Sequence, residues 1–287
     1  MKYIFIFSLI WILIITTTCK KQEAKGVVKQ SKLVKLWETP KNMLVSESVY
    51  YDRNRDVIYV SNINGKPLEK NGKGFMSKLN ADGKVLTEKW IEGLNAPKGM
   101  GVYKNKLYVS DIDEVVEIDL DENIITSRYS ADGSQFLNDI SIDSSGNVYI
   151  SDMTTQKIYR ISEGNIEVWL ESDQLNSPNG LFVERGNLLI GVTDFVLKSD
   201  LQTKEVSVFI SKTGGIDGLV PDGQGNYLIS DWEGCIHLIS KGKEKIKLLD
   251  STADKINAAD IDYVVSRKIL LVPTFFDNRV MAYTLEN

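Results

Sequence analysis

The chain has 287 residues and a net charge of −5 at pH 7, and its lysines and arginines form no cluster. This charge distribution argues against a nucleic-acid partner, because phosphate binding requires a concentrated basic patch. Hydrophobic residues make up 43% of the chain, which includes 12 tyrosines and 21 glycines, and no long helical period stands out. The composition therefore favours a single soluble, β-rich domain.

Residues 1–18 resemble the signal peptide of a bacterial lipoprotein. Lys2 provides a short positive region, and the apolar run at 4–15 is shorter than the roughly 20 residues that span a bilayer. Small residues then lead to Cys19, which we expect to be lipidated and to anchor the mature protein in the cell envelope, either in the periplasm or on the surface. Alternatively, this is an ordinary signal peptide and the cysteine is incidental. The polar residues 19–31 predict a tether between the lipid and the folded domain.

One apolar phrase recurs six times in the rest of the chain. The copies are VIYVSN at 57–62, KLYVSD at 106–111, NVYISD at 147–152, NLLIGV at 187–192, NYLISD at 226–231 and ILLVPT at 269–274. A period of about 40 residues with short strands is typical of propeller blades, each of which is a four-stranded sheet. Six blades fill residues 32–287 and leave no room for a second domain. The sequence thus predicts an all-β, six-bladed β-propeller.

The two ends of this region predict how the propeller closes. The strand-like segment KLVKLWET begins at Lys32, before every other strand, and the last strand is NRVMAYTL at 278–285. We expect these segments to pair, so that the N-terminal strand completes the C-terminal blade and no long edge stays unpaired. Trp37 would then be buried in the sixth blade.

One position changes its residue type from repeat to repeat, ten to twelve residues before the middle of each phrase. In chain order it holds Glu47, Lys98, Asn138, Asn179, Asp217 and Ala259. The start of each innermost strand faces the central channel of a propeller, so these residues should meet around one axis. A glycine follows the position in LNAPKGM, LNSPNGL and GGIDGLV, which would let the backbones pack closely where the blades converge. Alternatively, these residues are polar turn residues that solvate the ends of loops.

Four of the six axial residues carry side-chain oxygen atoms. Two carboxylates and two amides make a hard, all-oxygen site, which suits Ca²⁺ with waters completing its ligands. The axial position holds no histidine or cysteine, so a structural zinc site is not expected there. The segment KNGKGF at 70–75 lacks phosphate-loop spacing and gives no support for nucleotide binding.

Four segments carry a resemblance to a known family. ESVYYDRNRDVIYVSN, FLNDISIDSSGNVYISD, SPNGLFVERGNLLIGV and IDGLVPDGQGNYLISD resemble blades of the gluconolactonase family, which includes senescence marker protein and luciferin-regenerating enzyme. The resemblance implies one divalent cation at the channel mouth, usually calcium or zinc, with magnesium and manganese also possible. It implies Glu47, Asn179 and Asp217 as ligands, with Asn138 completing the site or reaching it through water.

The chain departs from the family at the substrate side of this site. Sugar-lactone hydrolases of the family carry an arginine two residues before Asn138, where this chain has Phe136, and this argues against recognition of a sugar acid. Lys98 could supply the missing positive charge. Alternatively, Lys98 is a solvated lysine at the channel rim.

The chemistry is narrowed by the single histidine, His237, which is expected on a strand away from the axis, exposed or half-buried. Without an axial histidine, a mechanism that uses a histidine base or a serine triad is not expected. Metal-assisted hydrolysis remains, in which a cation polarises a carbonyl and a carboxylate activates water. The leading prediction is hydrolysis of a lactone or ester, with Asp217 as ligand and general base, and with Lys98 and Asn138 contacting the substrate. The alternative is a non-catalytic cell-surface propeller that binds a protein or glycan around a structural ion.

Overall fold

The computed structural model describes residue 1 and residues 31–240, 242 and 244–286. Residues 2–18 of the expected signal peptide, Cys19 and all of the tether except Ser31 lie outside the described residues. Residues 31–287 form one compact unit. Among the described residues, no helix is both long and apolar enough to cross a membrane.

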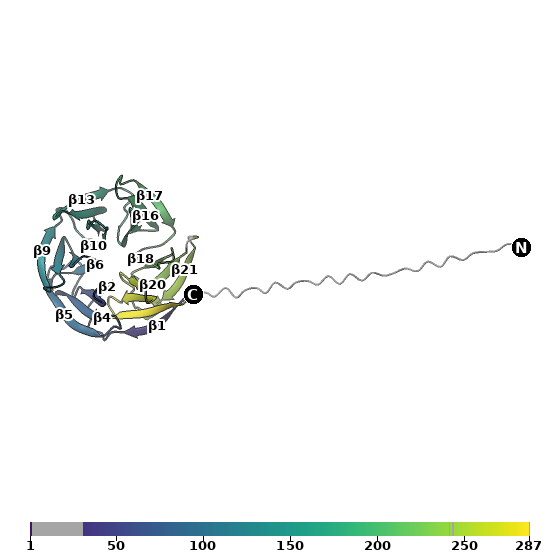
Figure 1. Cartoon of the computed structure of the whole chain (residues 1–287), viewed down its shortest axis with the longest axis horizontal. Coiled ribbons are helices and arrows are strands. Elements are labelled where there is room, and N and C mark those ends of the chain that lie inside the picture. Colours follow the sequence, from purple (N-terminus) through teal and green to yellow (C-terminus); the bar gives the residue numbers. More distant parts are fainter. Residues whose placement is uncertain (2–30, 241, 243, 287) are drawn as a thin grey trace. The chain divides into compact units, whose positions relative to one another are not determined.

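The described chain folds into six antiparallel four-stranded sheets arranged around a centre, as the repeat predicts (Figure 1). Blades one to three contain β2 (Ser46–Asp52), β3 (Val57–Asn62), β4 (Gly74–Asn80) and β5 (Val85–Leu94); β6 (Pro97–Tyr103), β7 (Lys106–Asp111), β8 (Glu114–Asp119) and β9 (Ile124–Ser130); and β10 (Leu137–Ile142), β11 (Val148–Asp152), β12 (Lys157–Ser162) and β13 (Asn165–Glu171). Blades four to six contain β14 (Leu181–Glu184), β15 (Asn187–Val192), β16 (Phe195–Asp200) and β17 (Val206–Ser211); β18 (Leu219–Pro221), β19 (Tyr227–Ser230), β20 (Cys235–Ile239) and β21 (Lys245–Asp250); and β22 (Asp262–Val264), β23 (Ile269–Pro273), β24 (Val280–Glu286) and β1 (Lys32–Glu38). One 3₁₀ turn (Thr252–Asp254) is the only helical element in the described part of the chain.

The predicted closure is confirmed, because β1 is the outermost strand of the sixth blade. It pairs antiparallel with β24, from Lys32 opposite Glu286 to Glu38 opposite Met281. Figure 1 shows the first strand beside the last one, purple next to yellow. The chain ends therefore complete one sheet together, and the pairing removes the edge that β24 would otherwise expose.

Trp37 does not lie where the sequence predicts. It is half-buried rather than buried, and its ring covers the turn between β4 and β5 of blade one. A Cβ atom at Gly83, in that turn, would lie 2.4 Å from the ring. An outermost strand contributes side chains to the surface between blades, so Trp37 packs against the neighbouring blade and not inside its own.

The apolar core lies between neighbouring blades. One cluster joins Val57, Tyr59 and Met76 of blade one to Val109 and Val116 of blade two, all of them buried. Successive side chains on a strand point to opposite faces, so each blade offers one apolar face to each neighbour. This packing fixes the position of each innermost strand relative to the next.

The glycines after the axial position have the role that the sequence predicts. A Cβ atom on Gly99 would lie 2.5 Å from Cα of Asp139 in the next blade. A Cβ atom on Gly218 would lie 2.5 Å from the backbone nitrogen of Ile261. A side chain at either position would force the innermost strands apart, so glycine permits the close convergence of the blades at the channel.

Candidate functional site

Five of the six axial residues line one pocket of about 410 Å³, which we call the mouth pocket. The five are Glu47, Lys98, Asn138, Asn179 and Asp217. Each lies at or just before the start of an innermost strand, so the pocket is at the end of the channel where these strands begin. The sixth axial residue, Ala259, is fully buried in a small apolar cluster and does not line the pocket. Blades one to five therefore supply the polar groups.

Local irregularity of the strands places three of these side chains. The register of β2 against β3 shifts between Ser46 and Val49, and equivalent shifts flank Lys98 and Asn138. Such bulges re-aim the side chains within them and are often found beside functional sites. The axial residues thus leave the regular alternation of the strand and enter the pocket.

Two oxygen atoms in the mouth pocket are buried without a hydrogen bond. Within the described structure, neither Glu47 Oε2 nor Asn179 Oδ1 has a partner, although their residues are only 4% and 7% exposed. The amide nitrogen of Asn179 donates to Asp217 Oδ1 at 2.8 Å, and that of Asn138 donates to Met153 Sδ at 2.8 Å. Both amides therefore use their nitrogen on the protein. Buried polar atoms are almost always satisfied, so these two orphan oxygens are available to a ligand or to a water molecule.

Burial also shifts the acidity of the two carboxyl groups. Burial raises the pKa of Glu47 well above its usual value; the negative charge of Asp217 adds to this rise and the positive charge of Lys98 opposes it. Burial raises the pKa of Asp217 to about 7, against the hydrogen bond from Asn179. Both groups would ionise more readily beside a cation, because an opposite charge favours the charged form.

Lys98 is a buried lysine and not a solvated lysine at the rim, which corrects that interpretation of the sequence. It is 1% exposed, and its Nζ donates to the carbonyl oxygen of Ala96 at 2.9 Å. The same nitrogen lies 4.9 Å from the ring centre of Phe136, at cation–π distance. Burial lowers the pKa of Lys98 to about 8, and Glu47 and Asp111 oppose this change.

The donor chemistry of the mouth pocket suits a hard cation. In the part of the chain that the structure describes, no group of three or more His, Cys, Asp or Glu side chains is placed to hold a metal ion. The four oxygen-bearing axial residues include only two carboxylates, and the other two are amides, which count as calcium ligands in proteins. No imidazole or thiolate of the described residues lines the pocket, so its donors match calcium better than zinc.

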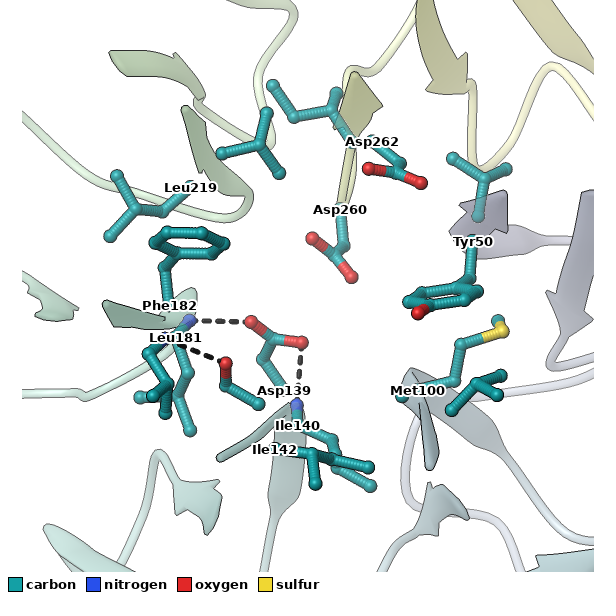
Figure 2. Close-up of a pocket in the computed structure, with 17 residues that line it drawn as sticks. Tyr50, Met100, Asp139, Ile140, Ile142, Leu181, Phe182, Leu219, Asp260 and Asp262 are labelled. Atoms are coloured by element: carbon teal, nitrogen blue, oxygen red, sulfur yellow. Dashed lines mark hydrogen bonds between the residues drawn. The ribbon is translucent and has the colours of Figure 1, made fainter. Parts of the chain in front are cut away.

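A second cavity of about 200 Å³ lies further along the channel, and we call it the inner chamber (Figure 2). It contains three aspartates that the sequence analysis missed: Asp139, Asp260 and Asp262. Figure 2 shows the carboxylates of Asp139 and Asp260 pointing toward the middle of the chamber. Both of these residues directly follow an axial position, where three other blades carry glycine. An aspartate in place of this glycine could have identified Asp139 and Asp260 from the sequence.

The inner carboxylates connect the blades. Asp139 in blade three accepts a hydrogen bond from the backbone nitrogen of Leu181 in blade four at 2.5 Å. Asp260 accepts a hydrogen bond from Ser48 Oγ at 2.5 Å, and Asp262 accepts one from the backbone nitrogen of Tyr51 at 2.7 Å. In both cases the donor is in blade one and the acceptor is in blade six. Burial raises the pKa of Asp139 to about 7 and that of Asp260 well above its usual value.

His237 and Cys235 lie on β20, and neither lines the mouth pocket or the inner chamber. His237 is half-buried, as predicted, and burial lowers its pKa to about 4. Cys235 is half-buried as well, whereas its place in a predicted strand favours a buried, small apolar side chain. A histidine-based mechanism in the mouth pocket has no residue to support it.

No protein-family model matches this sequence, and no curated protein sequence matches it either. Solved structures do match in fold. A catalytically inactive virginiamycin B lyase from Staphylococcus aureus with quinupristin has a TM-score of 0.62 at 12% identity, covering 90% of this chain and 99% of that chain. A streptogramin B lyase has a TM-score of 0.62 at 11% identity, covering 90% and 98%. The WD40 β-propeller domain of Doa1 has a TM-score of 0.62 at 11% identity, covering 84% and 78%. At these identities the likeness concerns the fold alone, and it identifies this chain as a β-propeller.

Proposed function

We propose that the mouth pocket binds one divalent cation, Ca²⁺ by preference, and that the protein hydrolyses a lactone or a related ester there. The observation that carries the proposal is the pair of orphan oxygens, Glu47 Oε2 and Asn179 Oδ1, buried beside a second carboxylate. A cation would satisfy both oxygens and offset the burial of the two negative charges. The resemblance of four segments to gluconolactonase blades supports a lactone or ester as the substrate class.

The chain's own residues take distinct roles in this proposal. Glu47, Asn138, Asn179 and Asp217 hold the cation, which when bound would polarise the substrate carbonyl. Among the described residues, none donates a hydrogen bond to the Oδ2 atom of Asp217, so this atom is free to accept a proton from the attacking water. Lys98 faces the same pocket and is the only cationic side chain that the described residues contribute to its wall, so it would stabilise negative charge that develops on the substrate.

Metal analysis and activity measurements on one purified preparation test the proposal. We expect about one equivalent of calcium per chain, loss of hydrolysis after chelation and recovery when Ca²⁺ is returned. The substrates would be a panel of lactones and aryl esters. Metal bound at these residues without turnover of any lactone or ester, whatever the cation, would instead favour the non-catalytic propeller with a structural ion.

We also propose that Cys19 carries a lipid that anchors the protein in the bacterial cell envelope, on the basis of the signal-like sequence before it. The acylated chain should partition into detergent, whereas Cys19→Ser should be released or misprocessed. A wild-type chain that is secreted with an unmodified N-terminus would contradict the anchor and leave the proposed catalysis untouched.

A further inference from the structure

The wall of the mouth pocket carries an aromatic cluster that the proposed hydrolysis does not use. Trp232, Phe275 and Phe276 pack edge to face, with ring centres 5.4, 5.8 and 4.8 Å apart. Phe275 is buried, whereas Trp232 and Phe276 are 43% and 60% exposed. All three residues line the pocket that holds the axial polar groups. Apolar and aromatic walls around a few polar groups are typical of sites for small molecules.

The cluster faces the polar groups from the one side of the channel without a polar axial residue. Trp232 lies between β19 and β20, and Phe275 and Phe276 lie between β23 and β24 of blade six, whose axial residue is Ala259. Phe275 packs on Ala259 in the same apolar cluster. Blades one to five therefore supply the polar groups of the pocket, whereas blade six and the adjoining turn of blade five supply these three aromatic rings.

Backbone contacts hold the cluster in place. The backbone nitrogen of Phe275 donates to the carbonyl oxygen of Ser46 at 3.0 Å, directly before Glu47. The carbonyl oxygen of Trp232 accepts a hydrogen bond from Asn257 Nδ2 at 2.8 Å. The aromatic rings are thus tied to the same framework as the candidate ligands, and they line the same pocket.

We propose that Trp232, Phe275 and Phe276 form a subsite for an apolar substituent, so that the substrates are lactones or esters with an aryl or alkyl group. This inference rests on the proposed hydrolase function and narrows its substrate class. Polyhydroxylated sugar lactones would leave hydroxyl groups against ring faces that offer them no hydrogen-bond partner. The half-buried Phe136 adds a fourth ring on the blade-three side of the pocket, in contact with Lys98.

The size of the pocket agrees with this class. Its volume of about 410 Å³ lies in the range of roughly 300–1,000 Å³ that is typical of small-molecule sites. A five-membered lactone ring with a phenyl or hexyl substituent fits within this space. A bare lactone ring would leave the aromatic side of the pocket empty.

Substrate selectivity of the full chain, with saturating Ca²⁺, tests the subsite. The substrates are γ-butyrolactone, γ-phenyl-γ-butyrolactone and gluconolactone. We expect kcat/KM for the phenyl lactone to exceed the other two by about tenfold or more, as burial of a phenyl group allows. In the double variant Trp232→Ala, Phe276→Ala, the ratio of kcat/KM for the phenyl lactone to that for γ-butyrolactone should fall about tenfold. Both residues are partly exposed, so the variant should fold.

Phe195→Ala is the matched control, because Phe195 is 39% exposed and does not line the mouth pocket. It should leave the ratio unchanged. An unchanged ratio in the double variant, or a preference for gluconolactone in the wild type, would overturn the subsite while the hydrolase function stands.

If no substrate is hydrolysed with any cation, the proposed function is wrong. The subsite can then still be tested by measuring the binding of non-hydrolysable analogues. The probes are γ-phenyl-γ-butyrolactam and γ-butyrolactam, which keep the ring shape but resist hydrolysis, and calorimetry measures their Kd. Binding of the phenyl lactam about tenfold more tightly than the bare lactam, lost in the double variant, supports the apolar subsite. Equal affinity for the two lactams in the wild type rejects it.

Discussion

The mouth pocket and the inner chamber both contain buried carboxylates, but the two sets differ in their hydrogen bonds. In the inner chamber, Asp139 and Asp262 accept backbone N–H groups from a neighbouring blade, at 2.5 and 2.7 Å. In the mouth pocket, Glu47 Oε2 has no partner among the described residues. Burial is equally deep in both places, since Asp139 is 5% and Glu47 is 4% exposed. Asp217 in the mouth pocket does accept a hydrogen bond from Asn179 of the neighbouring blade. The unpaired Oε2 of Glu47, rather than burial, therefore separates the two regions.

The difference distinguishes carboxylates that stabilise the fold from a carboxylate with an oxygen that a ligand can contact. A carboxylate that accepts hydrogen bonds across two blades holds them together, and its removal leaves buried N–H groups unpaired. A buried carboxylate with a free oxygen costs stability in the absence of a counter-charge. Such a cost is common at functional sites, where the ligand supplies the missing interaction.

The largest expected effect is on catalysis. Asp217→Asn keeps the shape of the side chain but removes the proposed base, so kcat should fall by about 10²–10⁴-fold even at saturating Ca²⁺. Asp262→Asn in the inner chamber is the control and should keep turnover close to that of the wild type. Steady-state kinetics with the preferred lactone measures both variants. Full rescue of Asp217→Asn by added cation would reduce Asp217 to a ligand alone.

The next effect concerns pH in the metal-free protein. Asp217 has a pKa of about 7 in the folded state and an ordinary value of 3.8, so between these pH values the folded state binds more protons than the unfolded state. The free energy of unfolding should therefore fall as the pH rises from about 4 to about 7. At pH 8, chelated Asp217→Asn should be more stable than the chelated wild type by about 4 kcal/mol, and about equal to it at pH 4. Urea unfolding at the two pH values measures this. A wild type that is more stable at pH 8 would show that Asp217 is not an unpaired charge.

Calcium should stabilise the wild type by an amount of similar size. A ligand that binds only the folded state at 100 times its Kd contributes about 2.7 kcal/mol, so Tm should rise with Ca²⁺ and fall with chelator. Glu47→Gln removes one ligand charge and should shrink this response, whereas Asp262→Asn should leave it unchanged. Differential scanning calorimetry with and without chelator provides the readout. An identical calcium response in Glu47→Gln and the wild type would place the cation elsewhere.

The smallest effect should come from the inner chamber. Asp139→Ala leaves the buried backbone N–H groups of Ile140 and Leu181 without their acceptor, which should lower the free energy of unfolding by about 1–3 kcal/mol. The rise of Tm with Ca²⁺ should persist, because Asp139 belongs to the blade-to-blade contacts. Loss of the calcium response in this variant would break the distinction between the two regions.

Much of the fold could be predicted because it depends on patterns of residues that are close together in the sequence. The period of about 40 residues and the period-two alternation predict the six blades, and the chain ends predict the closing pair of β1 and β24. The axial residues were found because equivalent positions in a propeller must converge on one axis. Ala259 is the one apolar residue at the axial position, and it marks the side of the channel where the aromatic side chains lie. Those aromatic residues lie in turns and loops whose sequences are not repeated from blade to blade, so the repeat could not predict them.

The blade count, the closing strand and the residues at the channel mouth follow from patterns within the sequence. The hydrogen-bond partners of the buried carboxylates do not, because their donors come from a different blade. Asp139 and Leu181 are 42 residues apart, and Asp262 and Tyr51 are 211 apart. Lys98 shows the same limit, since its burial beside Phe136 depends on how two blades approach each other. Local patterns set which side chains face the channel, whereas contacts between blades set their hydrogen bonds and their pKa values.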